Sequence, residues 1–261
     1  MIEEPYRWVE AIGNRREYIE HQLAGGSPIA CLGYNDGILF FTLGRERQKI
    51  FEIYDRIAMG AIGHPGDIER LRMAAIEVAS TEGFTRSAQD VSLRRLANYS
   101  LSPALKTAFE QVYGAPYLAR MIFAELGRGN EANLFLRLEY DGSIHASGIS
   151  HSPHPENFGV ISDSRNSTEL MEKYLRGQDF ANSDLRSALN IAMDAWTVGH
   201  LAMDGEAPAE LPPPEKIAAH RQEQLGSSVI EAAVLERSSS LPITFRTLTN
   251  DELASLQKPK D

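Results

Sequence analysis

The chain has 261 residues, of which 43% are hydrophobic, and its formal net charge is −10. This acidic balance disfavours a nucleic-acid groove or an anionic membrane surface as the main partner. The single cysteine, Cys31, cannot form an internal disulfide, and the N-terminus carries Glu3 and Glu4 without the apolar run of a secretory signal or membrane span. We therefore expect a cytoplasmic protein, and because no flexible linker interrupts the chain before residue 204, we expect residues 1–261 to form one domain.

Residues 5–23 are predicted to form a helix that begins near Pro5 and ends at the pair Gly25-Gly26. Its apolar side chains fall on one stripe, whereas the opposite face is charged. This pattern indicates a helix on a surface or against another subunit. The stripe consists of Trp8, Ile12, Ile19 and Leu23.

Two apolar runs at 29–32 and 38–42 flank the turn Asn35-Asp36-Gly37, which is typical of an antiparallel hairpin. The runs "KIFEIYD" and "RIAMGAIG" continue the sheet, with Asp55-Arg56 as the turn between them. The small residues of the second run allow another group to approach the backbone closely.

Two helices are predicted to follow these strands. Asp67 can cap the first, in which Ile68, Leu71 and Ala75 have helical spacing. Ser87 and Asp90 resemble a capping box that opens the second, which is interrupted near Pro103. His64 is interpreted as a helix-entry residue.

The second half of the chain returns to strands and then alternates again. Strands are predicted at 117–126, 133–140, 143–147, 158–162, 228–236 and 243–248, and helices at 167–176, 183–203 and 249–257. The polar, proline-rich segment 204–225 is predicted to be an exposed excursion. The sandwich core then comprises 27–203 and 226–250, and 251–261 forms a tail.

This order of elements predicts two sheets packed face to face, with a pair of helices covering each outer face. The expected fold class is therefore α/β (α+β), a four-layer αββα sandwich.

Three stretches carry a family resemblance: "GYNDGILFF", "QKIFEIYDRIAMGAIGHPGDIERLRMAAIEVA" and "SSVIEAAVLERSSSLPITFRTLT". In this order they resemble proteasome α-type subunits of the bacterial, actinobacterial type, and the resemblance runs from about residue 12 to 250. It implies the fold of N-terminal-nucleophile hydrolases with an extra N-terminal helix at residues 5–23. It also implies a heptameric ring that caps a ring of β-type subunits, with the segment before Pro5 as the gate.

The resemblance raises one catalytic alternative. In the β-type sisters, a propeptide that ends in glycine is removed to free a threonine, whose amine acts as general base. Ser27 falls at that threonine, Gly26 precedes it and Lys49 falls at the family's lysine, but Leu43 stands where the aspartate is expected. Pro28 also removes a backbone donor at the start of the strand.

The resemblance also implies a docking role for Lys49. In α rings the matching lysine lies in a pocket between neighbouring subunits and receives the C-terminal carboxylate of an activator, such as an ATPase ring, whose tail ends hydrophobic, tyrosine, any residue. Gly63 matches the pocket glycine and Glu17 an acidic pocket wall. The alternative interpretation is a solvated lysine at a strand end beside a structural glycine.

One departure from the family concerns Glu20, which stands where relatives usually carry arginine. A carboxylate near the pocket entry is expected to repel an incoming carboxylate, unless Arg15 or Arg16 compensates.

The sequence thus favours a non-catalytic α-type subunit that docks activators and gates entry. Its alternatives are a self-processing hydrolase that uses Ser27 and Lys49, or an orphan ring scaffold. No cofactor is expected. No metal site is expected either, because His145, His151 and His154 lack a neighbouring cysteine or a helical spacing.

Overall fold

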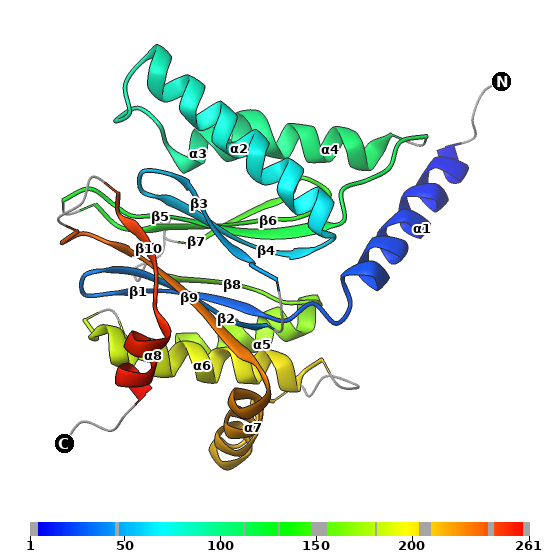
Figure 1. The fold of residues 1–261 in the computed structure, drawn as a ribbon. Coiled ribbons are helices and arrows are strands. Elements are labelled where there is room, and N and C mark those ends of the chain that lie inside the picture. The colour runs from blue at the N-terminus through cyan, green and yellow to red at the C-terminus, as the bar shows by residue number, and fades with distance from the viewer. Residues whose placement is uncertain are drawn as a thin grey trace.

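The chain folds into two five-stranded antiparallel sheets that lie face to face, with helices over both outer faces (Figure 1). The four-layer αββα sandwich expected from the sequence is confirmed. In this computed structural model the described residues are 5–44, 47–111, 113–129, 131–147, 156–180, 182–203, 210–239 and 243–257.

The first sheet has the strand order β10-β9-β2-β1-β8 and the second the order β3-β4-β5-β6-β7. The strands of the first sheet are β1 (Ile29–Tyr34), β2 (Gly37–Gly44), β8 (Phe158–Ile161), β9 (Val229–Glu236) and β10 (Phe245–Thr247). Those of the second are β3 (Ile50–Tyr54), β4 (Ile57–Gly63), β5 (Ala119–Glu125), β6 (Leu134–Leu138) and β7 (Ile144–Ser147).

The strands alternate between two cores, which explains why they read as almost continuous apolar runs. Phe40 of β2 points into the core between the two sheets, where it joins Ile29 and Ile122. Its neighbours Leu39 and Phe41 point the other way, into the core beneath the helices. Because side chains alternate along a strand, a strand buried on both faces has no polar face to show.

Helices close the two outer faces. The second sheet is covered by α2 (Pro65–Thr85), α3 (Leu93–Leu96), the π-helical turn η1 (Ala97–Leu101) and α4 (Ser102–Glu110). The first sheet is covered mainly by α5 (Arg165–Arg176) and α6 (Leu185–Leu201). The short α8 (Asn250–Gln257) confirms the helix expected near the C-terminus.

Two expected caps are wrong. The hydroxyl of Ser92, not that of Ser87, accepts the bond from Arg95 N that caps α3, and Ser87 belongs to a preceding turn. Helix α2 begins at Pro65, so Asp67 lies within its first turn, where its carboxylate accepts a hydrogen bond from Leu118 N. Both segments still form helices over the expected face, because the apolar spacing decides which face is buried.

Helix α1 (Pro5–Leu23) extends beyond the edge of the sandwich (Figure 1). Its C-terminal half packs on its own chain, since Ile19 and Leu23 are fully buried beside Phe109 and Tyr140. The expected apolar stripe is thus buried at this half against the chain's own core, not only on a surface or against another subunit. Trp8 stays partly exposed at 44%.

The expectation of an exposed excursion over 204–225 is also wrong for its second part. Residues Pro214–Ser227 form helix α7, which packs on α6, and Ile217 is buried there. Pro214 at the first helical position suits a helix start. Residues 204–209 lie outside the described residues.

Candidate functional site

A cavity of about 820 Å³ opens where the chain leaves α1 and enters β1. Its lining combines the segment after α1, the start of β3, the end of β4 and the C-terminal parts of α6 and α7. Ser27, Lys49 and Gly63 all line it. We call it the Lys49 pocket.

The hydroxyl of Ser27 is committed to structural hydrogen bonds. It donates to the carbonyl oxygen of Leu43 at 2.6 Å and accepts from the indole Nε1 of Trp196 at 3.1 Å. A hydroxyl without a base to take its proton is a weak nucleophile.

Position 43 holds no acid. The Leu43 side chain is buried in the core between the first sheet and α6. An apolar side chain in this place accepts no hydrogen bond and cannot hold the charge of a lysine. Only the backbone carbonyl of Leu43 faces Ser27.

Lys49 supplies a half-buried cation. Burial lowers the pKa of its ammonium, and the nearby carboxylate of Glu231 partly offsets this effect. Among the residues that the structure describes, none makes a hydrogen bond or an ion pair with that ammonium. Such a cation in a pocket suits an anionic ligand, because a charge withdrawn from water is stabilised by a partner.

Glu231 on β9 is a residue that the sequence analysis missed. Its carboxylate accepts hydrogen bonds from the backbone nitrogens of Lys49, at 2.9 Å, and Ile50, at 2.8 Å. This contact links the first sheet to the start of β3 and fixes the backbone that carries the lysine. The sequence signal that could have identified Glu231 is an acidic residue inside the apolar run "SVIEAAVLE". Burial raises the pKa of the Glu231 carboxyl.

Gly63 has a structural requirement of its own. Its φ is +130°, and an added Cβ would lie 2.1 Å from the carbonyl oxygen of Leu118. The glycine is thus required by the close pairing of β4 and β5, whether or not a ligand binds. Replacing Gly63 tests packing and cannot isolate docking.

The remaining candidates on α1 lie away from the lining of this pocket. Glu17 is on the exposed face of the helix. Arg15 donates to the carbonyl oxygens of Ala108, Phe109 and Gly114 around the end of α4, and Arg16 pairs with Asp141.

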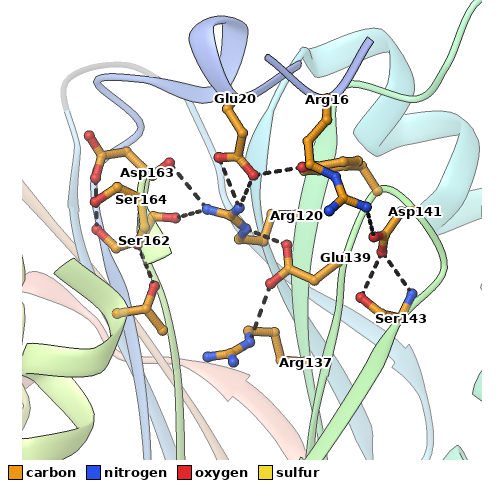
Figure 2. Close-up of polar contacts among 12 residues, drawn as sticks. Arg16, Glu20, Arg120, Arg137, Glu139, Asp141, Ser143, Ser162, Asp163 and Ser164 are labelled. Carbon is orange, nitrogen blue, oxygen red and sulfur yellow. Dashed lines mark hydrogen bonds and ion pairs between the residues drawn. The ribbon is translucent and has the colours of Figure 1, made fainter. Parts of the chain in front are cut away.

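Glu20 also lies outside the pocket, and it is neutralised by its own chain. Figure 2 shows its carboxylate directed at the guanidinium of Arg120, 3.1 Å away, and Tyr140 OH donates to it at 2.7 Å. The pairing with Arg120 weakens the basis for the expected repulsion between Glu20 and an incoming carboxylate, which stays a prediction.

Arg120 is the centre of a buried polar cluster that ties α1 to the sandwich (Figure 2). Its side chain is only 4% exposed and also bonds the carboxylate of Glu139 at 2.5 Å. It donates to the carbonyl oxygens of Ser162 and Asp163 just before α5. Burial by itself lowers the pKa of Arg120, but Glu139 and Glu20 raise it on balance.

No metal centre emerges from the described part of the chain, which contains no suitable group of three or more His, Cys, Asp or Glu side chains. The side chain of His145 is exposed on β7. His151 and His154 lie outside the described residues. Within the described ranges, no helix combines the length and apolar character that a bilayer crossing needs.

Comparison with known proteins decides the family. "Proteasome subunit alpha" of Kineococcus radiotolerans is 31% identical over 93% of this chain and 92% of its own length. The chain belongs to the proteasome α-subunit family. Proteins of the same name from Streptomyces scabiei, 28% identical over 95% of this chain, and Mycobacterium sp. strain KMS, 29% identical over 97%, agree. No family model matches the sequence.

Membership of the proteasome α-subunit family agrees with the sandwich and the additional helix α1, and confirms the resemblance on which the sequence analysis relied. The family match spans nearly the whole chain, so α7 lies within the matched length.

Replacing Glu20 with Gln removes the charge that faces Arg120. We expect Glu20→Gln to lower the free energy of unfolding by about 1.5 to 3 kcal/mol, the range for a hydrogen bond to a charged group. Denaturant unfolding measures the change, and hydrogen exchange should report faster opening of α1.

Glu10→Gln is the matched control, because Glu10 is exposed on the same helix. It should change the free energy of unfolding by less than about 0.5 kcal/mol. Equal effects of the two substitutions would show that the Arg120 cluster does not anchor α1.

Proposed function

We propose that this chain is the non-catalytic α-type subunit of a bacterial proteasome core particle. Seven copies form a ring that caps a ring of β-type subunits in the cytoplasm and controls which proteins enter. The Lys49 pocket receives the C-terminal tail of an activator, such as an ATPase ring, that ends hydrophobic, tyrosine, any residue.

The observation that carries this proposal is the half-buried Lys49, which lines a cavity of about 820 Å³. Its ammonium makes no hydrogen bond or ion pair with a described residue, although the Glu231 carboxylate is nearby. A chain terminus offers a carboxylate that can enter such a pocket. A charge-assisted hydrogen bond of this kind contributes about 1.5 to 3 kcal/mol. The apolar part of the lining, which includes Phe51 and Ile62, suits the hydrophobic side chains of the tail.

We assign Glu17 and Gly63 roles in tail binding that depend on assembly of the ring. Glu17 is exposed on α1 and free of the Lys49 pocket of its own chain. In a ring, an exposed face of one subunit meets the next subunit, so Glu17 is proposed as a wall of a pocket shared between neighbours. Gly63 forms the part of the lining where the tail backbone passes close to β4.

The absence of catalysis is argued from Ser27. Its hydroxyl proton is directed at the Leu43 carbonyl, and the side chain of residue 43 is apolar and buried. Each of the two removes one requirement of an N-terminal nucleophile.

One observation favours the competing function: Ser27 and Lys49 line the same cavity, as the hydrolase alternative requires. The orphan ring scaffold differs from the main proposal only in lacking a β-type partner. Co-expression with a β-type chain encoded beside it in the genome distinguishes the proteasome subunit from the orphan scaffold. The mass of the assembled particle shows whether a β ring has joined the α ring.

Replacing Lys49 with Ala should abolish stimulation of the reconstituted αβ particle by a free-carboxylate tail peptide. The same peptide with an amidated C-terminus should fail on the unmodified particle, because it lacks the anion. Peptide hydrolysis with and without tail peptide measures both effects. Unaltered stimulation of Lys49→Ala would assign docking to another place.

The pKa of Lys49 adds a control to that experiment. Because burial lowers the pKa, the ammonium loses its proton at a lower pH than an ordinary lysine, and tail affinity should fall as the pH rises through that value. Lys49→Arg keeps its charge at alkaline pH and should not show this fall.

Replacing Ser27 with Ala should leave peptide hydrolysis by the assembled αβ particle unchanged, because the serine is structural. Intact mass of the unmodified chain should still include residues 1–26. Loss of hydrolysis in an assembled Ser27→Ala particle, or a mass that begins at Ser27, would support the hydrolase instead.

A further inference from the structure

Helix α7 forms part of the wall of the Lys49 pocket. Gln224, in its last turn, and Ser228, which follows the helix, both line the cavity. Trp196 and His200 of α6 line it beside them. The opposite sheet contributes Lys49 and Gly63. The cavity therefore lies between the α6–α7 layer and the second sheet.

The wall that carries Gln224 is fixed in place by polar contacts between α7 and α6. Arg221 pairs with Asp194 at 2.9 Å, and Tyr174 OH donates to the same carboxylate at 3.3 Å. The ring nitrogens His200 Nδ1 and His220 Nε2 lie 2.9 Å apart. These contacts, together with the buried Ile217, hold α7 in one orientation relative to the pocket.

Two aromatic rings of α6, those of Trp196 and His200, are also fixed in position beside the pocket. The rings of Trp196 and His200 are stacked, with centroids 4.6 Å apart and an angle of 22° between their planes. The indole nitrogen of Trp196 donates to Ser27, and the side chain is only 2% exposed. The half-buried ring of His200 is therefore the part of this stack that can pack against a side chain of the ligand.

Gln224 adds a hydrogen-bond donor and acceptor to the lining of the pocket. Gln224 is a half-buried residue in the lining of the cavity, and its carboxamide makes no hydrogen bond with any described residue. A carboxamide both donates and accepts, as a peptide group does, so the two can pair. A polar group that is partly withdrawn from water and unpartnered gains most when a ligand supplies the missing bond.

We propose that Gln224 is a specificity-determining residue of the Lys49 pocket, whose carboxamide pairs with a backbone amide of the docked peptide while Lys49 binds its terminal carboxylate. The inference rests on the proposed function and deepens it. The pocket then selects an extended peptide chain with a free C-terminus, and a carboxylate without a peptide group next to it binds more weakly.

The test uses the full chain assembled as its ring and a synthetic eight-residue peptide that ends hydrophobic, tyrosine, any residue. An ester replaces each of the last three peptide bonds in turn, which removes one N–H donor at a time. We expect one of the three esters to bind the unmodified ring about five- to tenfold more weakly, which is within the range that one neutral hydrogen bond gives.

Gln224→Ala should bind the parent peptide about five- to tenfold more weakly and should no longer discriminate against that ester. Gln222→Ala is the matched control, an exposed glutamine on the same helix outside the pocket lining, and should bind all peptides like the unmodified ring. Circular dichroism and ring size verify that each variant is folded and assembled.

The inference is overturned if Gln224→Ala retains full affinity, if it still discriminates against the same ester, or if no ester weakens binding. The amidated peptide keeps this outcome separate from the proposed function. If amidation and Lys49→Ala leave affinity unchanged, docking at Lys49 itself fails. If both weaken binding and Gln224→Ala does not, only the role of Gln224 fails.

Discussion

A single buried guanidinium, that of Arg120, fixes the part of the molecule on which the candidate site depends. It joins α1 through Glu20, the end of the second sheet through Glu139, and the entry to α5 through two backbone carbonyls. A buried charge is stable only when its hydrogen bonds are satisfied, so these elements must meet in one arrangement. The segment Gly25-Gly26-Ser27, which follows α1, is thereby held at the rim of the Lys49 pocket. The backbone nitrogen of Gly25 donates a hydrogen bond to the carboxylate of Asp163 at 3.3 Å.

The residues of the Lys49 pocket could in principle bind a chain terminus or hydrolyse a peptide bond, and the side chain at position 43 distinguishes the two. Ser27 and Lys49 lie on its lining, yet Leu43 turns its side chain into the core and leaves only a carbonyl for the serine. The Lys49 ammonium makes no hydrogen bond or ion pair with a described residue, although the carboxylate of Glu231 lies near enough to raise its pKa. This geometry supports the proposal that the site binds chain ends and does not cut chains, because binding needs the cation alone while cleavage needs a free amine and an acid as well.

The sandwich could be predicted from the sequence because its determinants are local. Short continuous apolar runs, such as the one that contains Leu39 and Phe40, and the turn at Asn35-Asp36-Gly37 indicate strands without knowledge of distant residues. Helix α7 was missed because only Ile217 is buried and its other anchors, such as Arg221 to Asp194, join different helices. The partner of Glu20 was missed for the same reason, since Arg120 lies 100 residues away. The pocket residues were predicted only through the family resemblance.

The most direct test is a cryo-electron-microscopy structure of the assembled αβ particle with a bound tail peptide that has a free C-terminus. We predict density for the terminal carboxylate within about 2.7 to 3.2 Å of the Lys49 ammonium, and an unbroken chain through Gly26 and Ser27. A peptide bound away from Lys49, or a chain that begins at Ser27, would contradict the account.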